Sequence, residues 1–216
     1  PVPNAAIDRS IGRGVTFLLE RQNKNGSWGG PYRTKGLNIY APVPGAHHAF
    51  RCAVSALCVS ALIETHVPTG GDEDAVLRAI ARGEAYRLEE LPKVRRATPD
   101  AIYNVWAHGF GIEALVHMRK RLPDDAQRIL KIDKAIHDQY ELLEKYESVD
   151  GGWGYYDFDV GSKKPAASSS SFTTATIVVA LKQAADAGVS PPHRLVSRAL
   201  DSIRRQQKPD FSYLYG

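Results

Sequence analysis

Two kinds of helical pattern alternate along the chain. In the first, apolar residues recur every three or four positions among charged ones, as with Ile7, Ile11 and Val15 beside Asp8 and Arg9. This spacing is typical of an amphipathic helix with one buried side. The second kind is apolar nearly all round and covers residues 49–64, 101–118 and 173–187. Because such a helix needs cover on every side, the pattern predicts half-solvated outer helices alternating with inner ones.

The amphipathic segments share a further order of residues. Each opens on a basic residue followed by a small one, at Arg13-Gly14, Arg82-Gly83, Lys134-Ala135 and Arg198-Ala199. Three of them end in a turn that contains glycine or aromatic residues: Gly26-Ser27-Trp28, Gly151-Gly152-Trp153 and Phe211-Ser212-Tyr213. The spacing is irregular, but the recurring order predicts a repeat of helix and turn.

The turn residues suit structural rather than chemical work. Glycine permits a tight turn after a helix, and a tryptophan there can bury on the order of 200 Å² between neighbouring helix pairs. A glutamine near a helix end can satisfy carbonyl groups that lack a partner. We therefore predict structural clamps at Gln22, Gly26, Trp28, Gly152, Trp153 and Gln206.

The first segment resembles the QW repeat of squalene-hopene and oxidosqualene cyclases. It carries the order basic, small, aromatic, Leu, Gln and Gly-x-Trp at Arg13, Gly14, Phe17, Leu18, Gln22, Gly26 and Trp28. The third and fourth segments match in part. The resemblance implies an all-α protein of the terpene cyclase and protein prenyltransferase superfamily, an α/α toroid of antiparallel helix pairs with a cavity inside.

The same resemblance predicts how the chain is organised. We expect one repeat domain over residues 1–216 with three helix pairs and a last helix without an inner partner. A closed ring needs more pairs, so we expect an incomplete ring or open arc, part of a longer protein. An unpartnered amphipathic helix exposes apolar surface, so the arc is expected to associate with a second copy or with the remainder of the toroid.

If the inner helices face a cavity, several side chains would line its mouth. The candidates are His47, His48, Arg51, Tyr103, Asn104, Trp106, His108, Phe172 and Thr173. A lining of aromatic and histidine side chains suits an apolar or cationic ligand, either a small molecule or a peptide. The alternative is that the aromatic residues are ordinary core, which is frequent for rings at helical spacing.

The catalytic groups of the resembled families have no clear counterpart. Hopene-type cyclases start with an Asp-rich segment that ends in Thr-Ala, and its closest match here, Ser168–Ala175, has serines in place of the acids. Serine cannot protonate an alkene, so this alignment predicts loss of cyclisation. The Asp, Cys and His that hold zinc in prenyltransferases are missing, and His47-His48 reads as a cap or surface pair. We expect neither metal nor cofactor.

Three functions remain open from the sequence. The first is a non-cyclising module that binds a ligand or acts as a scaffold. The second is a terpenoid cyclase or prenyltransferase whose catalytic half lies outside this chain. The third is a carbohydrate-active α/α barrel enzyme that uses Asp157 and Asp159, with Tyr155 and Tyr156 as sugar platforms.

Composition narrows the partners. The chain has 216 residues, of which 43% are apolar and 24% charged, as in a soluble globular protein. Its basic residues gather after predicted helices, where they suit the helix dipole, so no nucleic-acid partner is expected. The charge-free stretch of residues 52–63 is too short to span a bilayer, and Cys52 and Cys58 lie too far apart on one helix for a disulfide.

Overall fold

The computed structural model describes residues 4–30, 44–65, 72–98, 101–157 and 169–215. Over these residues the chain forms seven α-helices and no strand, which confirms the all-α prediction. A 3-10 turn, η1 (Leu91–Lys93), follows the third helix. The helices are α1 (Asn4–Arg21), α2 (Pro44–Glu64), α3 (Glu73–Glu90), α4 (Asn104–Arg121), α5 (Ala126–Tyr146), α6 (Ser171–Asp186) and α7 (His193–Gln206).

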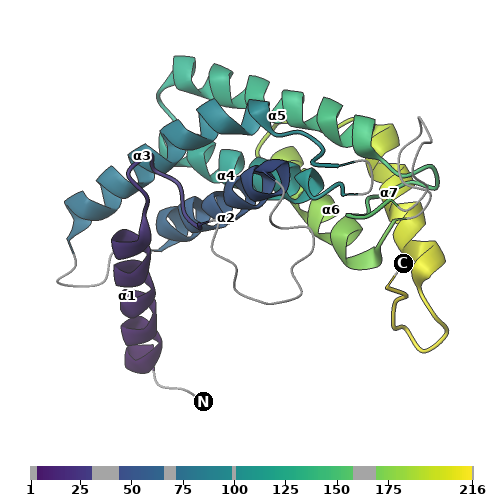
Figure 1. Cartoon of the computed structure of the whole chain (residues 1–216), viewed down its shortest axis with the longest axis horizontal. Helices are drawn as coiled ribbons and strands as arrows, with labels where there is room; N and C mark the ends of the chain where they lie inside the picture. Colours follow the sequence, from purple (N-terminus) through teal and green to yellow (C-terminus); the bar gives the residue numbers. More distant parts are fainter. Residues whose placement is uncertain (1–3, 31–43, 66–71, 99–100, 158–168, 216) are drawn as a thin grey trace.

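A row of three apolar helices lies at the centre of the molecule. Helix α4 packs against α2 on one side and α6 on the other. Each helix of the row is followed by a helix that packs on it, with α3 on α2, α5 on α4 and α7 on α6. In Figure 1, α5 runs along the upper edge of the molecule, and α1 and α7 lie at its two ends. The predicted inner segments thus correspond to α2, α4 and α6.

The structure corrects one expectation about pairing. We expected the last helix to lack an inner partner, but α7 packs on α6 and buries Leu195, Ala199, Ser202 and Gln206. The helix with little cover is α1, which buries no residue and projects from the body in Figure 1. The reason is that each outer helix packs mainly on the inner helix that precedes it along the chain, not on the one that follows.

The turn after α1 packs on the backbone of α3. Gln22 donates from Nε2 to the carbonyl oxygens of Gly26 at 3.0 Å and of Ala79 at 2.8 Å, and its Oε1 accepts from Arg82. Gly26 has a φ of +87°, and a Cβ at this position would lie 2.2 Å from the carbonyl oxygen of Arg82. Only glycine satisfies both the backbone conformation and the close approach.

The tryptophan of this turn links α1 to α2. Trp28 is buried, and its indole N–H donates to the carbonyl oxygen of Leu18 at 2.8 Å. Its backbone N–H donates to Oγ of Ser55 in α2, also at 2.8 Å. On its far side the ring reaches α3, where a Cβ on Gly83 would lie 3.0 Å from it. Gly83, the small residue after Arg82, therefore makes room for the indole.

The turn after α5 repeats this clamp. Gly151 has a φ of +91°, and a Cβ there would lie 2.5 Å from the carbonyl oxygen of Arg198 in α7. Trp153 donates its indole N–H to the carbonyl oxygen of Leu143 at 2.9 Å, and its backbone N–H donates to Oγ1 of Thr174 at 3.0 Å. Glu147 stands in the position of Gln22, and its carboxylate accepts a hydrogen bond from Nε of Arg198 at 2.6 Å.

A third turn, which follows α7, has the same backbone hydrogen bond as the two clamps, but no helix among the described residues packs on it. Lys208 donates its N–H to the carbonyl oxygen of Ser212 at 2.8 Å, as Asn23 does to Ser27 in the first clamp. Phe211 stands in the glycine position with a φ of +64°, and its side chain is 80% exposed. Gln22 lies four residues before Gly26, and the residue four before Phe211 is Gln207. Gln207, and not the predicted Gln206, therefore corresponds to Gln22.

Gln206 instead ties α7 to the segment before α6. Its Nε2 donates to Oγ of Ser169 at 3.0 Å and to Oγ of Ser202 at 3.3 Å. This helix pair is therefore held together by side-chain hydrogen bonds at its end as well as by apolar packing.

We predict that Gly26→Ala destabilises the protein by about 2–4 kcal/mol, because it combines a left-handed backbone with overlap on a carbonyl oxygen. Gly14→Ala is the matched control: the other glycine of the same motif lies within α1, and a Cβ there meets no described atom within 4 Å. It is expected to be neutral or to stabilise by about 0.5–1 kcal/mol. Urea unfolding of the two variants measures both. Equal effects would contradict the role of Gly26.

Candidate functional site

Aromatic side chains gather around the N-terminal ends of α4 and α6. Trp106 stacks on Phe110 and on Phe172, with ring centroids 5.8 Å and 5.9 Å apart. Tyr155 lies 5.8 Å from Phe172 and 6.3 Å from Trp106. Ring contacts join eight residues, called here the aromatic cluster: Phe50, Tyr103, Trp106, Phe110, Tyr155, Tyr156, Phe172 and Tyr215.

The cluster has a buried base and an exposed rim. Tyr103 is only 5% exposed, whereas Phe172 is 40% exposed and Tyr215 is 68% exposed. Exposed rings that are held in mutual contact present a continuous apolar surface to solvent. Surfaces of this kind mark binding sites more often than isolated exposed side chains do.

The second clamp positions part of this cluster. The chain leaves Trp153 and runs past the start of α4, where the backbone N–H of Ile102 donates to the carbonyl oxygen of Tyr155 at 3.0 Å. Next to it, the hydroxyl of Tyr103 donates to the hydroxyl of Tyr156 at 2.7 Å. A paired hydroxyl lets tyrosine take part in a partly buried apolar site without an unsatisfied polar atom.

The structure thus brings together three of the nine predicted cavity residues, Tyr103, Trp106 and Phe172. Sequence reasoning missed Phe50, Phe110 and Tyr215 as members of the group. Phe110 could have been found, since it follows Trp106 by four residues on one helix and therefore shares its face.

Two of the predicted residues lie in the core on the other side of α4. His108 and Asn104 are fully buried. Nδ1 of His108 is 2.8 Å from Oε1 of Gln139 in α5, and its Nε2 is 3.3 Å from Nδ2 of Asn104. Burial lowers the pKa of His108 to about 4, so the neutral ring donates through Nδ1 and accepts through Nε2. This network joins α4 to α5.

The remaining four predicted cavity residues are dispersed. Nε2 of His48 pairs with Glu90 at 3.0 Å and so connects α2 with α3. Thr173 is buried and accepts from the hydroxyl of Ser170 at 2.7 Å. His47 and Arg51 are partly exposed on α2.

The acidic pair predicted for a carbohydrate enzyme is placed only in part. Asp157 has a side chain that is 3% exposed and lies 3.0 Å from Nη2 of Arg96. Asp159 lies outside the described residues. Because this carboxylate is buried and already paired with Arg96, it is poorly placed to reach a sugar substrate.

Helix α4 has one face that the neighbouring helices leave uncovered. Along it, Trp106, Phe110, Glu113 and His117 recur every three or four residues and are the only partly exposed residues between Asn104 and Met118. The helices on either side also expose apolar side chains, and their exposed fractions lie between 37% and 55%. These residues are Phe50, Val54 and Leu57 in α2 and Phe172 and Val179 in α6.

The described residues also bear on metal binding and on membrane crossing. No group of three His, Cys, Asp or Glu side chains among the described residues could hold a metal ion. One helix, over Gly45–Glu64, is long and apolar enough to cross a membrane, although half of that stretch is buried within the protein. Its burial against α3 and α4 is equally expected of a core helix.

Comparison with known proteins adds no relative: no family model, curated protein or solved structure matches the chain.

The buried histidine makes stability depend on pH. His108 titrates near 4 in the native state and near 6.5 when unfolded, so the unfolded chain binds more protons between these values. Stability is therefore retained above about pH 6.5 and lost as the pH falls, by about 2 kcal/mol between pH 7 and pH 5. We predict that His108→Gln removes this share of the pH dependence in urea unfolding. If the unfolding free energy of the variant differed between pH 7 and pH 5 as much as that of the wild type, this prediction would be contradicted.

Proposed function

We propose that this chain is a repeat module of the squalene cyclase-like α/α type that binds an apolar, isoprenoid-like ligand on its aromatic cluster without cyclising it. The observation that carries the proposal is the cluster itself. Eight rings from α2, α4, α6 and three segments outside the helices are linked by ring contacts on a face where apolar side chains remain exposed.

The form of the cluster favours a ligand that is flat or elongated and apolar. Trp106 is stacked between Phe110 and Phe172 at interplanar angles of 16° and 26°. A hydrocarbon chain laid along these rings buries apolar area, worth about 25 cal/mol for each Å². Sugars also stack on aromatic rings, but they need polar partners around the ring, and Asp157 is already paired with Arg96.

The start of α6 supports binding without cyclisation. In the resembled cyclases the acid stands at this place, whereas here the described residues are serines bonded to protein groups. Ser169 contacts the hydroxyl of Ser202 at 2.5 Å, Ser170 donates to Thr173, and Ser171 donates to the carbonyl oxygen of Leu214 at 2.6 Å. These hydroxyls hold α6, α7 and the segment after α7 together.

The repeat architecture of the proposal has support in the two clamps. Each joins an outer helix, the next inner helix and the next outer helix through a left-handed glycine, a buried tryptophan and an Arg contact. A ring or arc would extend by repeating this unit, which is why we propose the toroid type.

The test is calorimetric titration of the purified chain with farnesol, with a soluble oligosaccharide as the comparison ligand. We predict that farnesol binds and that Trp106→Ala weakens it about tenfold or more through lost apolar contact. Phe17→Ala is the matched control. It removes an exposed ring on α1, beside an apolar groove of about 350 Å³ between α1 and α2.

The outcomes separate the alternatives. Loss of binding in Phe17→Ala but not in Trp106→Ala would move the site to the α1 groove and contradict the proposal. Binding of the oligosaccharide alone would favour a carbohydrate-active protein. No binding of either ligand by a folded chain would leave a scaffold role.

A further inference from the structure

The uncovered face of α4 changes character along its length. Trp106 and Phe110 belong to the aromatic cluster, and the next two residues on the same face are Glu113 and His117. At about 1.5 Å per residue, Glu113 lies about 10 Å and His117 about 16 Å beyond Trp106 along the helix. One face therefore has an apolar end and an ionisable end.

The carboxyl of Glu113 is unusual for a surface helix. It is partly buried, and this burial raises its pKa; His117 opposes the rise, and Glu64 adds to it. No basic residue lies one helical turn before Glu113. The charged groups that change its pKa are His117 in α4 and Glu64 in α2. An acid in this setting is stabilised by any cation brought close to it.

His117 connects this acid with the neighbouring helix. Its Nε2 lies 3.1 Å from Oε1 of Glu64 at the end of α2, and its side chain is only 12% exposed. Nδ1 of the same ring is buried and has no hydrogen-bond partner among the described residues. His117 thus pairs with Glu64 and acts electrostatically on Glu113, and its Nδ1 remains without a described partner.

Helix α6 supplies a fourth polar group at the same level. Phe172 contacts Trp106, and a Cβ on Gly109 would lie 3.0 Å from Cγ1 of Ile177, so α4 and α6 run parallel. Eleven residues beyond Phe172 and Trp106 stand Gln183 and His117, on the same helix faces. Oε1 of Gln183 is also buried without a described hydrogen-bond partner.

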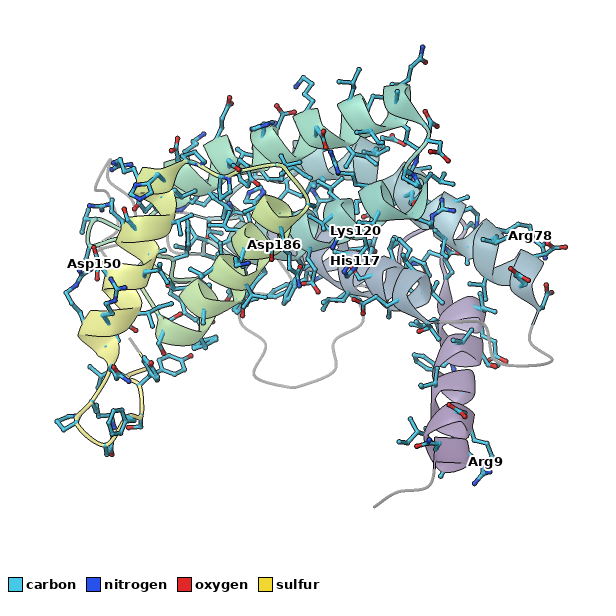
Figure 2. All side chains as sticks on the ribbon, turned by 180° about the vertical axis from the view of Figure 1, so that it is seen from behind. Arg9, Arg78, His117, Lys120, Asp150 and Asp186 are labelled. Carbon is cyan, nitrogen blue, oxygen red and sulfur yellow. The ribbon has the colours of Figure 1, made fainter. Side chains whose placement is uncertain are left out.

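Figure 2 shows this part of the molecule from behind. It labels His117 and Lys120 in α4 and Asp186 at the end of α6, and the three labels lie close together in the middle of the view. Helices α4 and α6 pack against each other.

We propose that Glu64, Glu113, His117 and Gln183 bind the protonated amine of an amphiphilic ligand whose hydrocarbon body lies on the aromatic cluster. This inference rests on the proposed function and names its ligand class. Most atoms that the four side chains offer are hydrogen-bond acceptors: four carboxylate oxygens and the amide oxygen of Gln183. With both carboxyls ionised, the group has a charge of −1 or −2 for either protonation state of His117.

The net charge of the whole chain cannot explain a preference for an amine. The formal net charge is +4, so attraction to the protein as a whole would favour an anionic amphiphile over a cationic one. A preference for an amine must therefore come from local carboxylates. Charged hydrogen bonds are also stronger than neutral ones, so an amine is expected to gain over an alcohol of the same skeleton.

The test compares three ligands with one hydrocarbon body: farnesylamine, farnesol and farnesoic acid, titrated at pH 7 into the full 216-residue chain. We expect the amine to bind about tenfold more tightly than the alcohol and the acid to bind most weakly. Glu113→Gln, which keeps the size of the side chain, should bring amine binding to the level of farnesol and leave farnesol binding unchanged. Glu141→Gln, an exposed acid on α5, is the control and should change neither.

Each outcome bears on one claim. Equal binding of amine and alcohol by the wild type would overturn this inference and leave the proposed function standing. An amine preference that survives in both Glu113→Gln and Glu64→Gln would also overturn it, because the charge would then come from elsewhere. If none of the three ligands binds the folded chain, the proposed function fails as well. Far-ultraviolet circular dichroism confirms that each variant is folded.

Discussion

A glycine pressed against a helix carbonyl determines how closely neighbouring helix pairs approach. At Gly26 and Gly151 the left-handed backbone brings the turn so near to the next outer helix that a Cβ would overlap its carbonyl oxygen. This contact fixes where the following tryptophan enters the core, and the indole N–H then bonds to the outer helix that precedes it. Since only Gly154 separates Trp153 from Tyr155 and Tyr156, the same contact helps to determine where those rings meet Tyr103.

The order of packing explains why one face of the inner row stays apolar and uncovered. Each outer helix lies on the preceding inner helix, and the inner helices leave Phe50, Trp106 and Phe172 at least partly exposed within one aromatic cluster. Towards α5, helix α4 holds buried polar groups that contact polar side chains, such as His108 with Gln139. The opposite side carries Trp106 and Phe110, which solvent reaches. Cover on one side only gives the molecule a structural face and a face available for binding.

Much of this could be predicted from the sequence, and the remainder depends on three-dimensional packing. Periodicity identified the three inner helices, and the Gly-x-Trp turns indicated the clamps, because both signals are local. The place of Glu147 was missed, since a carboxylate replaces the glutamine and its arginine partner, Arg198, lies 51 residues away. Asn104 and His108 were proposed for a cavity because they follow one another on an apolar helix, but sequence alone does not say which face α5 covers. The pattern gave no signal that the segment after the third turn brings Tyr215 to Phe172.

Exposed apolar residues are found both on α1 and in the aromatic cluster, and their packing distinguishes these two places. On α1, Ile7 and Ile11 are exposed, and Val15 and Leu18 are only partly buried against the core. In the aromatic cluster, by contrast, the rings touch in succession and the tyrosine hydroxyls are paired with one another, as between Tyr103 and Tyr156. Ordering side chains costs conformational entropy, and a surface that is ordered before a ligand arrives loses less on binding. Preorganisation, rather than exposed area, is therefore the physical reason to assign binding to the inner row and not to α1.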